Sequence, residues 1–192
     1  GIQRDAINCV HDVLAVHPWP TCWTKQVLAK HLEHQSNSNP LNLKRGSGGT
    51  MDIECAVQLL QMVHAHAHPQ VLVPGTLAAL QQLSQADLIA TDVAQQLSDD
   101  YELLRSIESG IRLMNLTARH ELPSSPAALR RLAYLISRPD SPTQWNADSL
   151  VEQCQLAQQR CRVQFNTIFD EALGPADERP DRVFATTPPL NH

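Results

Sequence analysis

The sequence predicts an all-α fold, a multi-helix bundle of about five to seven helices. Apolar residues recur three and four positions apart through most of the chain, most clearly after Thr91 and after Asn146. In the helix after Asn146, the residues expected to point inward are Leu150, Cys154, Ala157, Cys161, Phe165 and Ile168. This spacing places them on one face of a helix, whereas a strand would need strict alternation. Stretches rich in proline, glycine or serine separate the periodic segments, and no segment has the pattern of a convincing strand.

The individual elements follow from the same periodicity. Six longer helices are expected, in chain order, over Arg4–Val16, Thr24–His34, Thr50 to about His64, Thr91 to about Met114, Ser125–Ile136 and Asn146 to about Phe169. Two brief helices, Thr76–Leu83 and Ser84–Ile89, are expected between the third and fourth of these. Between the third and fourth helices, Gln70–Val73 is expected to be a short extended piece at most.

Capping residues support these boundaries. Thr50, Thr91 and Asn146 are expected to be N-caps, because their side-chain oxygens can accept from free amides of a first helical turn. Ser125 precedes a proline, which suits the first position of a helix. Ser84 and Asp87 form a weak capping box. The helix after Thr91 is expected to be the longest.

Length and composition limit the number of domains. With 192 residues and 42% hydrophobic content, the chain suits one globular domain with a sizeable core. We expect this helical domain to span residues 1–173. Residues 174–192 lose the apolar periodicity and regain prolines, so a flexible, disordered tail is expected there.

Charge and cysteine usage exclude several classes of protein. The net charge is −5, so there is no basic footprint for nucleic acid. No run of apolar residues is long enough for a membrane span, and no signal peptide is seen. The five cysteines lack metal-ligand spacing and mostly occupy apolar helical positions. Reduced, buried thiols in a cytoplasmic protein are expected.

A basic, glycine-rich loop leads directly into the third helix. Lys44 and Arg45 precede three glycines within four residues, and glycine lets a backbone approach another surface closely. The two basic side chains and the amides of Gly48 and Gly49 could therefore contact nucleotide phosphates or the edge of a neighbouring domain. The alternative is a tight loop fixed only by packing.

Acidic and polar residues continue from this loop along the third helix. Asp52 and Glu54 lie in or near its first turn, where carboxylates complement the helix dipole. Glu54, Gln58 and Gln61 form one polar stripe on an otherwise apolar helix. Because a largely buried carboxylate needs a partner, we expect an arginine opposite Glu54.

Arg105 lies on a second charged stripe, together with Glu108 and Arg112. Spacing of three and four places these side chains on one helix face. Such a stripe is usually an exposed ladder of ion pairs. The alternative is that Arg105 faces Glu54 and the glycine loop.

The sequence does not predict a self-contained catalytic or metal site. Two carboxylates at positions i and i+2 of a helix point about 200° apart, so Asp52 and Glu54 cannot jointly hold metal ions. Lys44 precedes the glycines, whereas a phosphate-binding Walker loop has its lysine after them. His64 and His68 lack a visible third ligand. We expect no catalytic residue, metal ligand or bound cofactor in this chain alone.

Residues 44–58 resemble a known family. They read Lys-Arg-Gly-Ser-Gly-Gly-Thr-Met-Asp-Ile-Glu-Cys-Ala-Val-Gln, followed by His64-Ala65-His66 and Pro69. This is similar to the segment after the C-terminal, adenylylating catalytic domain of bacterial glutamine synthetase adenylyltransferases, Gly-Gly-x-x-Asp-Ile-Glu-Phe-x-x-Gln. Cys55 replaces the phenylalanine of that pattern. The resemblance is specific from Leu43 to about Asn115.

The resemblance implies a role within a larger enzyme. That enzyme transfers AMP from ATP, with Mg²⁺, to a tyrosine of glutamine synthetase, under control of a PII signalling protein. This chain would be a helical domain accessory to an upstream nucleotidyltransferase domain, which would hold the metal-binding carboxylates. Arginines occur in the family near the position of Arg105, which favours a role at the domain interface.

Two alternatives to the adenylyltransferase function remain open. One is a non-catalytic helical module that binds a protein partner of its own. The other is the equivalent domain of a PII uridylyltransferase-like enzyme or of the deadenylylating half. The Asp-Ile-Glu form at 52–54 argues against the deadenylylating half.

Overall fold

The computed structural model describes residue 13 and residues 18–36, 38–39, 42–115, 120–137 and 145–174. The predicted first helix, Arg4–Val16, lies outside these ranges except for Val13. The predicted tail lies outside them except for Gly174. Within the described ranges, no helix is both long and apolar enough to cross a lipid bilayer.

The described part of the chain is all-α, as predicted. Its elements are the helices α2 (Thr21–Ser36), α3 (Thr50–His64), α4 (Thr76–Gln85), α5 (Thr91–Asn115), α6 (Pro126–Ile136) and α7 (Ala147–Leu173), with a short 3₁₀ helix, η1 (Pro69–Val71), after α3. The described β-structure is a single isolated bridge between Asn42 and Glu121.

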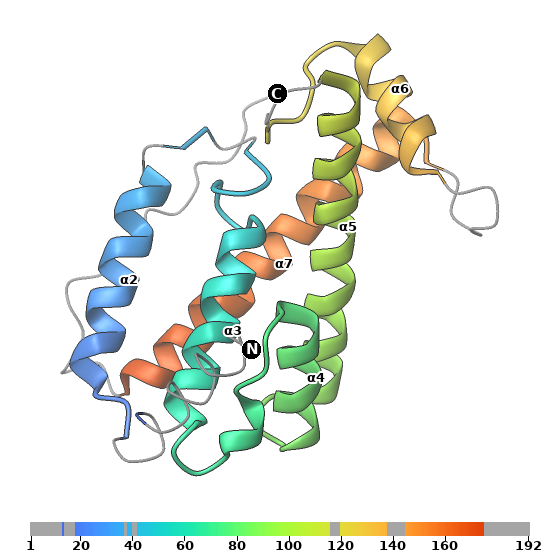
Figure 1. The fold of residues 1–192 in the computed structure, drawn as a ribbon. Helices are drawn as coiled ribbons and strands as arrows, with labels where there is room; N and C mark the ends of the chain where they lie inside the picture. Colours follow the sequence, from blue (N-terminus) through green and yellow to red (C-terminus); the bar gives the residue numbers. More distant parts are fainter. Residues whose placement is uncertain are drawn as a thin grey trace, which may run out of the picture.

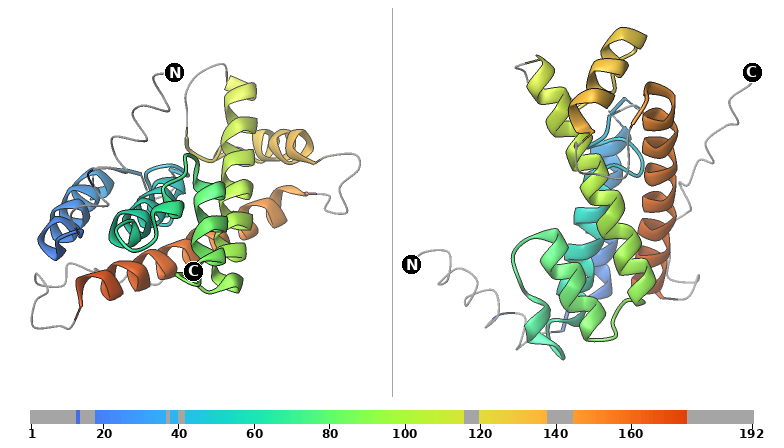
Figure 2. Two further views of the ribbon diagram at one scale, coloured as in Figure 1. Left: turned by 60° about the horizontal axis from the view of Figure 1, so that its bottom comes forward. Right: turned by 90° about the vertical axis from the view of Figure 1, so that its right-hand side faces the viewer.

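Helix α7 organises the bundle. It crosses behind α3 and α5 (Figure 1), packs against both of them and against α2, and its N-terminal end packs against α6. Figure 2 shows α7 along one side of the molecule, with α4 and α5 stacked beside α3. A helix that contacts most of the others brings together residues that are far apart in the sequence.

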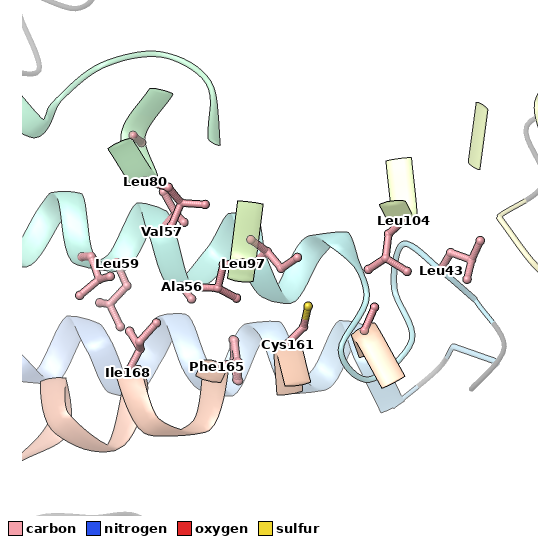
Figure 3. Close-up of a cluster of buried hydrophobic side chains, with 14 of the residues drawn as sticks. Leu43, Ala56, Val57, Leu59, Leu80, Leu97, Leu104, Cys161, Phe165 and Ile168 are labelled. Atoms are coloured by element: carbon pink, nitrogen blue, oxygen red, sulfur yellow. The ribbon is translucent and has the colours of Figure 1, made fainter. Parts of the chain in front are cut away.

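The apolar face of α7 was predicted correctly. All six residues expected to point inward are buried: Leu150, Cys154, Ala157, Cys161, Phe165 and Ile168. They meet α3 and the start of the glycine loop in one continuous core, part of which Figure 3 shows. Leu43, in the loop itself, is completely buried in this core. The core therefore fixes the loop as well as the helices.

Two predicted N-termini are confirmed by their capping bonds. The Asn146 side chain accepts from the Ser149 amide at 2.8 Å, and the Ser149 hydroxyl accepts from the Asn146 amide at 3.1 Å. The Ser125 hydroxyl accepts from the amide of Ala128 at 3.2 Å, directly before Pro126.

Thr50 is not an N-cap, contrary to the prediction. Gly49 is the N-cap of α3, and it has no side chain to accept a hydrogen bond. Thr50 is the first helical residue, and its hydroxyl is buried without a hydrogen-bond partner among the described residues. In place of a Thr50 cap, the carboxylate of Asp52 accepts from the amide of Gly48, just before the N-cap residue.

Other boundaries also differ from the prediction. Residues 84–89 do not form a helix of their own, because α4 continues to Gln85 and the chain then turns through Asp87 at φ 55°. The Ser84 hydroxyl bonds Thr91 instead of capping a helix. Residues 69–71 are 3₁₀ rather than extended. Helix α7, with 27 residues, is longer than α5, with 25.

Candidate functional site

The glycine loop, residues 42–49, is a compact turn with internal hydrogen bonds. The side chain of Asn42 accepts from the amides of Lys44 and Arg45, at 3.0 and 2.8 Å. The amide of Gly46 donates to the Asn42 carbonyl at 2.8 Å. The amide of Leu43 donates to the carbonyl of His120 at 2.7 Å, which joins the loop to the segment between α5 and α6. These bonds fix the backbone beneath Lys44 and Arg45.

Gly48 makes the close approach that the sequence predicted. Its φ is +72°, and a Cβ atom at this position would lie 1.8 Å from the carbonyl oxygen of Gln158 on α7. Gly49 is also tightly enclosed, since its Cβ would lie 2.6 Å from the carbonyl oxygen of Lys44. Gly48 thus approaches a helix of the same bundle, whereas Gly49 is enclosed by the backbone of the loop itself.

Asp52 is the anchor of this loop. Its carboxylate is completely buried and accepts four hydrogen bonds. Oδ2 accepts from the amide of Gly48 at 2.7 Å and from Nη1 of Arg162 at 3.2 Å. Oδ1 accepts from Nε2 of His31 at 2.6 Å and from the side chain of Gln35 at 3.0 Å. The helix-dipole role expected for Asp52 is therefore only part of its function in the fold.

The partners of Asp52 also contact one another. Arg162 donates to the Gln35 side-chain oxygen at 2.9 Å, and its guanidinium lies 5.0 Å from the centre of the Phe165 ring. The His31 ring stacks on the same phenylalanine, with 4.9 Å between ring centres. Gln35 also donates to the carbonyl of Gly46 at 3.3 Å. The cluster ties α2, the loop, α3 and α7 together.

These contacts use groups that the sequence offered for ligand binding. The amide of Gly48 donates to Asp52, and the amide of Gly49 donates to the Gly46 carbonyl at 2.9 Å. The charged groups of the loop are the exposed Arg45 and the half-buried Lys44, and Ser47 beside them is exposed as well. Among the described residues, neither of these two cations forms an ion pair. The loop therefore presents two adjacent positive charges on a fixed backbone.

Among the described residues no arginine pairs with Glu54, contrary to the prediction. Its Oε1 accepts from the hydroxyl of Tyr101 on α5 at 2.9 Å. Burial, above all, raises the pKa of Tyr101 above its usual value. Gln58 is exposed, while the Gln61 side chain donates to the carbonyls of Val71 and Val73 at 2.7 and 2.9 Å. An arginine, Arg162, bonds instead to Asp52, two residues before Glu54 in α3.

Only part of the charged stripe on α5 is exposed to solvent, whereas an exposed ladder of ion pairs was the first expectation. Glu108 is 2% exposed, and it accepts from Nη1 of Arg105 at 3.1 Å. Its other oxygen lies 3.4 Å from Nδ1 of His120. Arg105, 46% exposed, pairs within its own helix rather than with Glu54 or the loop. It lines an open groove of about 1050 Å³ together with Tyr101, Thr76 and Trp145.

The predicted candidates thus fall into two groups. The loop group contains Lys44, Arg45, Gly48, Gly49 and Asp52. The other group, Glu54 and Arg105, is connected through Tyr101 and the groove, with Gln58 exposed further along α3.

Sequence analysis missed three residues of the loop group: His31, Gln35 and Arg162. The apolar spacing of residues 24–34 places His31 on the inward face of its helix with Leu28, but it does not identify a partner for the ring. A buried carboxylate needs a positive charge nearby, and this applies to Asp52. Arg162 directly follows the inward-facing Cys161, so its place on α7 was the sequence signal that could have identified it as the partner of Asp52.

The histidines after α3 have no metal-binding arrangement within the described ranges, where no three His, Cys, Asp or Glu side chains cluster suitably for an ion. Burial, and secondarily the proximity of His68, lowers the pKa of His64.

The described structure defines an all-α domain in which a fixed glycine loop leads into a largely buried helix. The sequence model of the family described as GlnD PII-uridylyltransferase matches residues 23–169. Because this match covers more than half of the chain, the chain belongs to that family.

Curated relatives carry the name bifunctional glutamine synthetase adenylyltransferase/adenylyl-removing enzyme. The protein from Streptomyces coelicolor is 43% identical over 90 residues, which are 47% of this chain and 9% of the relative. The protein from Cutibacterium acnes is 37% identical over 91 residues, with the same two coverages. The one from Mycobacterium tuberculosis H37Rv is 42% identical over 81 residues, 42% of this chain and 8% of the relative. The matched part therefore spans less than a tenth of these relatives.

Proposed function

We propose that this chain is the helical accessory domain of an enzyme that transfers AMP from ATP to a tyrosine of glutamine synthetase. The observation that carries the proposal is the glycine loop of residues 42–49, fixed by Asp52 and presenting Lys44 and Arg45 outward. The similarity to adenylyltransferases of glutamine synthetase supports the choice of reaction.

The described residues do not offer a site for Mg²⁺. Both oxygens of the buried Asp52 carboxylate already accept two hydrogen bonds each. Glu54 is bonded to Tyr101 and lies two residues away on the same helix, pointing in another direction. The metal-binding carboxylates and the catalytic residues would belong to a nucleotidyltransferase domain outside this chain, and the chain alone would be inactive.

Lys44 and Arg45 would then contact an anionic surface. Two cations without ion-pair partners in the described structure suit either the phosphates of a bound nucleotide or acidic side chains of the catalytic domain. A fixed backbone reduces the entropy lost when such a contact forms. Arg105, in the open groove, is the second candidate for the domain interface.

The proposal also includes the cellular location of the enzyme and its regulation. The described cysteines, Cys22, Cys55, Cys154 and Cys161, are free thiols, which suits a cytoplasmic enzyme. The proposal includes regulation by a PII signalling protein, and this part rests only on the resemblance of residues 44–58 to the adenylyltransferase family.

The first test compares this chain with the full-length enzyme that contains it. Transfer of labelled AMP from ATP to purified glutamine synthetase is measured in the presence of Mg²⁺. We expect activity in the full-length enzyme and none in this chain alone. Activity of this chain alone would overturn the accessory role.

The second test addresses the loop. In the full-length enzyme, the double variant Lys44→Ala/Arg45→Ala is expected to lower the transfer rate by about tenfold or more, since two charged contacts would be lost. The matched control is Arg130→Ala/Arg131→Ala, which removes two exposed cations from α6. Equal activity of the two double variants would mean that Lys44 and Arg45 do not contribute to the transfer reaction.

A uridylyltransferase is the second candidate, because the matching family is described by that activity. The same full-length enzyme is therefore assayed with UTP and a PII protein as acceptor. Transfer of UMP to the PII protein, without transfer of AMP to glutamine synthetase, would favour this candidate.

A further inference from the structure

We propose that Arg162 is a positioning residue, which holds the glycine loop in place through Asp52. The inference rests on the proposed function, and it assigns a role to a residue of α7 that is 110 positions away from Asp52. Arg162 does not reach the exposed face of the loop itself. It acts on the carboxylate that holds Gly48.

The geometry gives Arg162 a position between two elements. A single nitrogen, Nη1, donates to Oε1 of Gln35 on α2 at 2.9 Å and to Oδ2 of Asp52 on α3 at 3.2 Å. Oδ2 is also the atom that accepts from the Gly48 amide at 2.7 Å. One carboxylate oxygen is therefore shared between α7 and the loop.

Arg162 supplies the permanent positive charge at this carboxylate. His31 and Gln35 can donate hydrogen bonds to Asp52, but a glutamine is neutral and a histidine is charged only when protonated. A buried carboxylate without a countercharge is unfavourable. Without Arg162, Asp52 would lower this cost by rotating toward solvent or by taking up a proton, and either change weakens its bond to Gly48.

The other attachments of the loop explain how the bond between Gly48 and Asp52 limits its motion. At its start the loop is held by Asn42 and by the bond from Leu43 to His120. Among the described residues, the only side-chain attachment at its end is the bond from Gly48 to Asp52, where Gly48 has a left-handed conformation against α7. The amides of Thr50 and Met51 also donate to the carbonyls of Leu43 and Lys44, at 2.9 and 3.1 Å. Loss of the bond to Asp52 would leave backbone bonds at the end of the loop and would therefore give Lys44 and Arg45 more freedom to move.

Trypsin reports this release directly, because it cleaves after lysine and arginine. A protease needs an extended segment, so cleavage of the folded loop requires local opening. We expect Arg162→Gln to increase the rate of cleavage after Lys44 or Arg45 by about tenfold or more in this chain, identified by the masses of the fragments. The wild-type chain is the reference.

Arg160→Gln is the matched control. Arg160 lies on the same helix and makes a similar ion pair, from its Nε to Oδ2 of the buried Asp100 at 3.0 Å. Arg160 and Arg162 are both partly exposed, at 38% and 21%. Asp100 is on α5, and no hydrogen bond among the described residues joins Asp100 or Arg160 to the loop. Equal acceleration of cleavage in both variants would mean general destabilisation and would overturn the proposal.

Arg162→Lys keeps the test decisive if Arg162→Gln does not fold. Lysine retains the charge, but its nitrogen is one atom closer to the backbone than Nη1, and it lacks the guanidinium that lies over the Phe165 ring. We expect loop cleavage at a rate between those of the wild type and Arg162→Gln, and in any case a few times faster than the wild type. A rate equal to that of the wild type would overturn the role of Arg162.

The full-length enzyme then separates the two proposals. If the loop contacts nucleotide or the catalytic domain, Arg162→Lys should raise the KM for ATP or lower kcat, while Arg160→Lys leaves both nearly unchanged. Faster loop cleavage with unchanged transfer kinetics would retain Arg162 as the positioning residue of the loop and would reject the role of the loop in transfer.

Discussion

The alpha carbon of Gly48 faces the backbone of Gln158 so closely that no side chain fits between them. A Cβ atom on Gly48 would lie 1.8 Å from the Gln158 carbonyl oxygen and 2.5 Å from its carbonyl carbon. Both obstructing atoms belong to the backbone of α7, in the middle of a helix, and cannot move aside as a side chain can. The loop and α7 therefore form one packed unit.

Gly48→Ala is expected to destabilise the domain by about 2–4 kcal/mol, because the left-handed conformation and the collision with α7 act together. Urea unfolding followed by circular dichroism measures this free energy. Gly75→Ala is the matched control, since Gly75 also has a positive φ, +91°, but nothing lies within 4 Å of its Cβ position. We expect a loss of only about 1 kcal/mol there. Similar losses at both positions would contradict the packing argument.

Phe165→Ala is expected to cost about 3–5 kcal/mol of unfolding free energy. The ring is buried and stacks on Phe169, with 4.5 Å between ring centres, and on His31 at 4.9 Å. Its removal leaves a cavity beneath the Asp52 cluster. Val163→Ala, on the exposed face of the same helix, should change stability by less than about 0.5 kcal/mol. Comparable losses would mean that α7 is not anchored through this ring.

Tyr101 is expected to ionise above the usual pH of a tyrosine, because burial and its bond to Glu54 raise its pKa. The chain contains two tyrosines, and the other, Tyr134, is 80% exposed. An ultraviolet titration should show a component above pH ~10 that disappears in Tyr101→Phe and persists in Tyr134→Phe.

The same shift has a consequence for stability. The pKa of Tyr101 is higher in the folded state than in the unfolded state, so its contribution is fully present below the unfolded pKa, about 10. It is lost as the pH rises through the folded pKa. The stability advantage of the wild type over Tyr101→Phe should therefore shrink in strongly alkaline solution. An advantage that grows with pH would contradict the assigned burial.

The cysteines are expected to differ sharply in reactivity. Burial raises the pKa of Cys55 and of Cys154 to about 12, and it also raises that of Cys161, whereas Cys22 is exposed. Because the thiolate is the reactive form, a maleimide should modify Cys22 much faster than the three buried thiols. The measurement uses a Cys9→Ser background and mass spectrometry. Fast modification of Cys154 in the native protein would contradict its burial.

Local signals were sufficient for much of the fold. The spacing of Leu150, Cys154 and Phe165 predicted which face of α7 is buried, and Asn146 and Ser125 predicted where two helices begin. These features depend on residues within one or two turns, so they can be read from neighbouring positions. Predictions failed where one local choice competes with another, as at Thr50, which is not an N-cap, while the Asp52 carboxylate accepts from the amide of Gly48.

The sequence by itself determined the fold class, the family-like loop and helix start, and the need of Gly48 for close contact. Only the tertiary structure decided what Gly48 contacts and which acid is buried. The crossing of α7 behind α3 brings Arg162 to Asp52 across 110 positions, and the packing of α5 brings Tyr101 to Glu54 across 47. Periodicity assigns a residue to one face of a helix, but the crossing of two helices decides which residues meet on those faces.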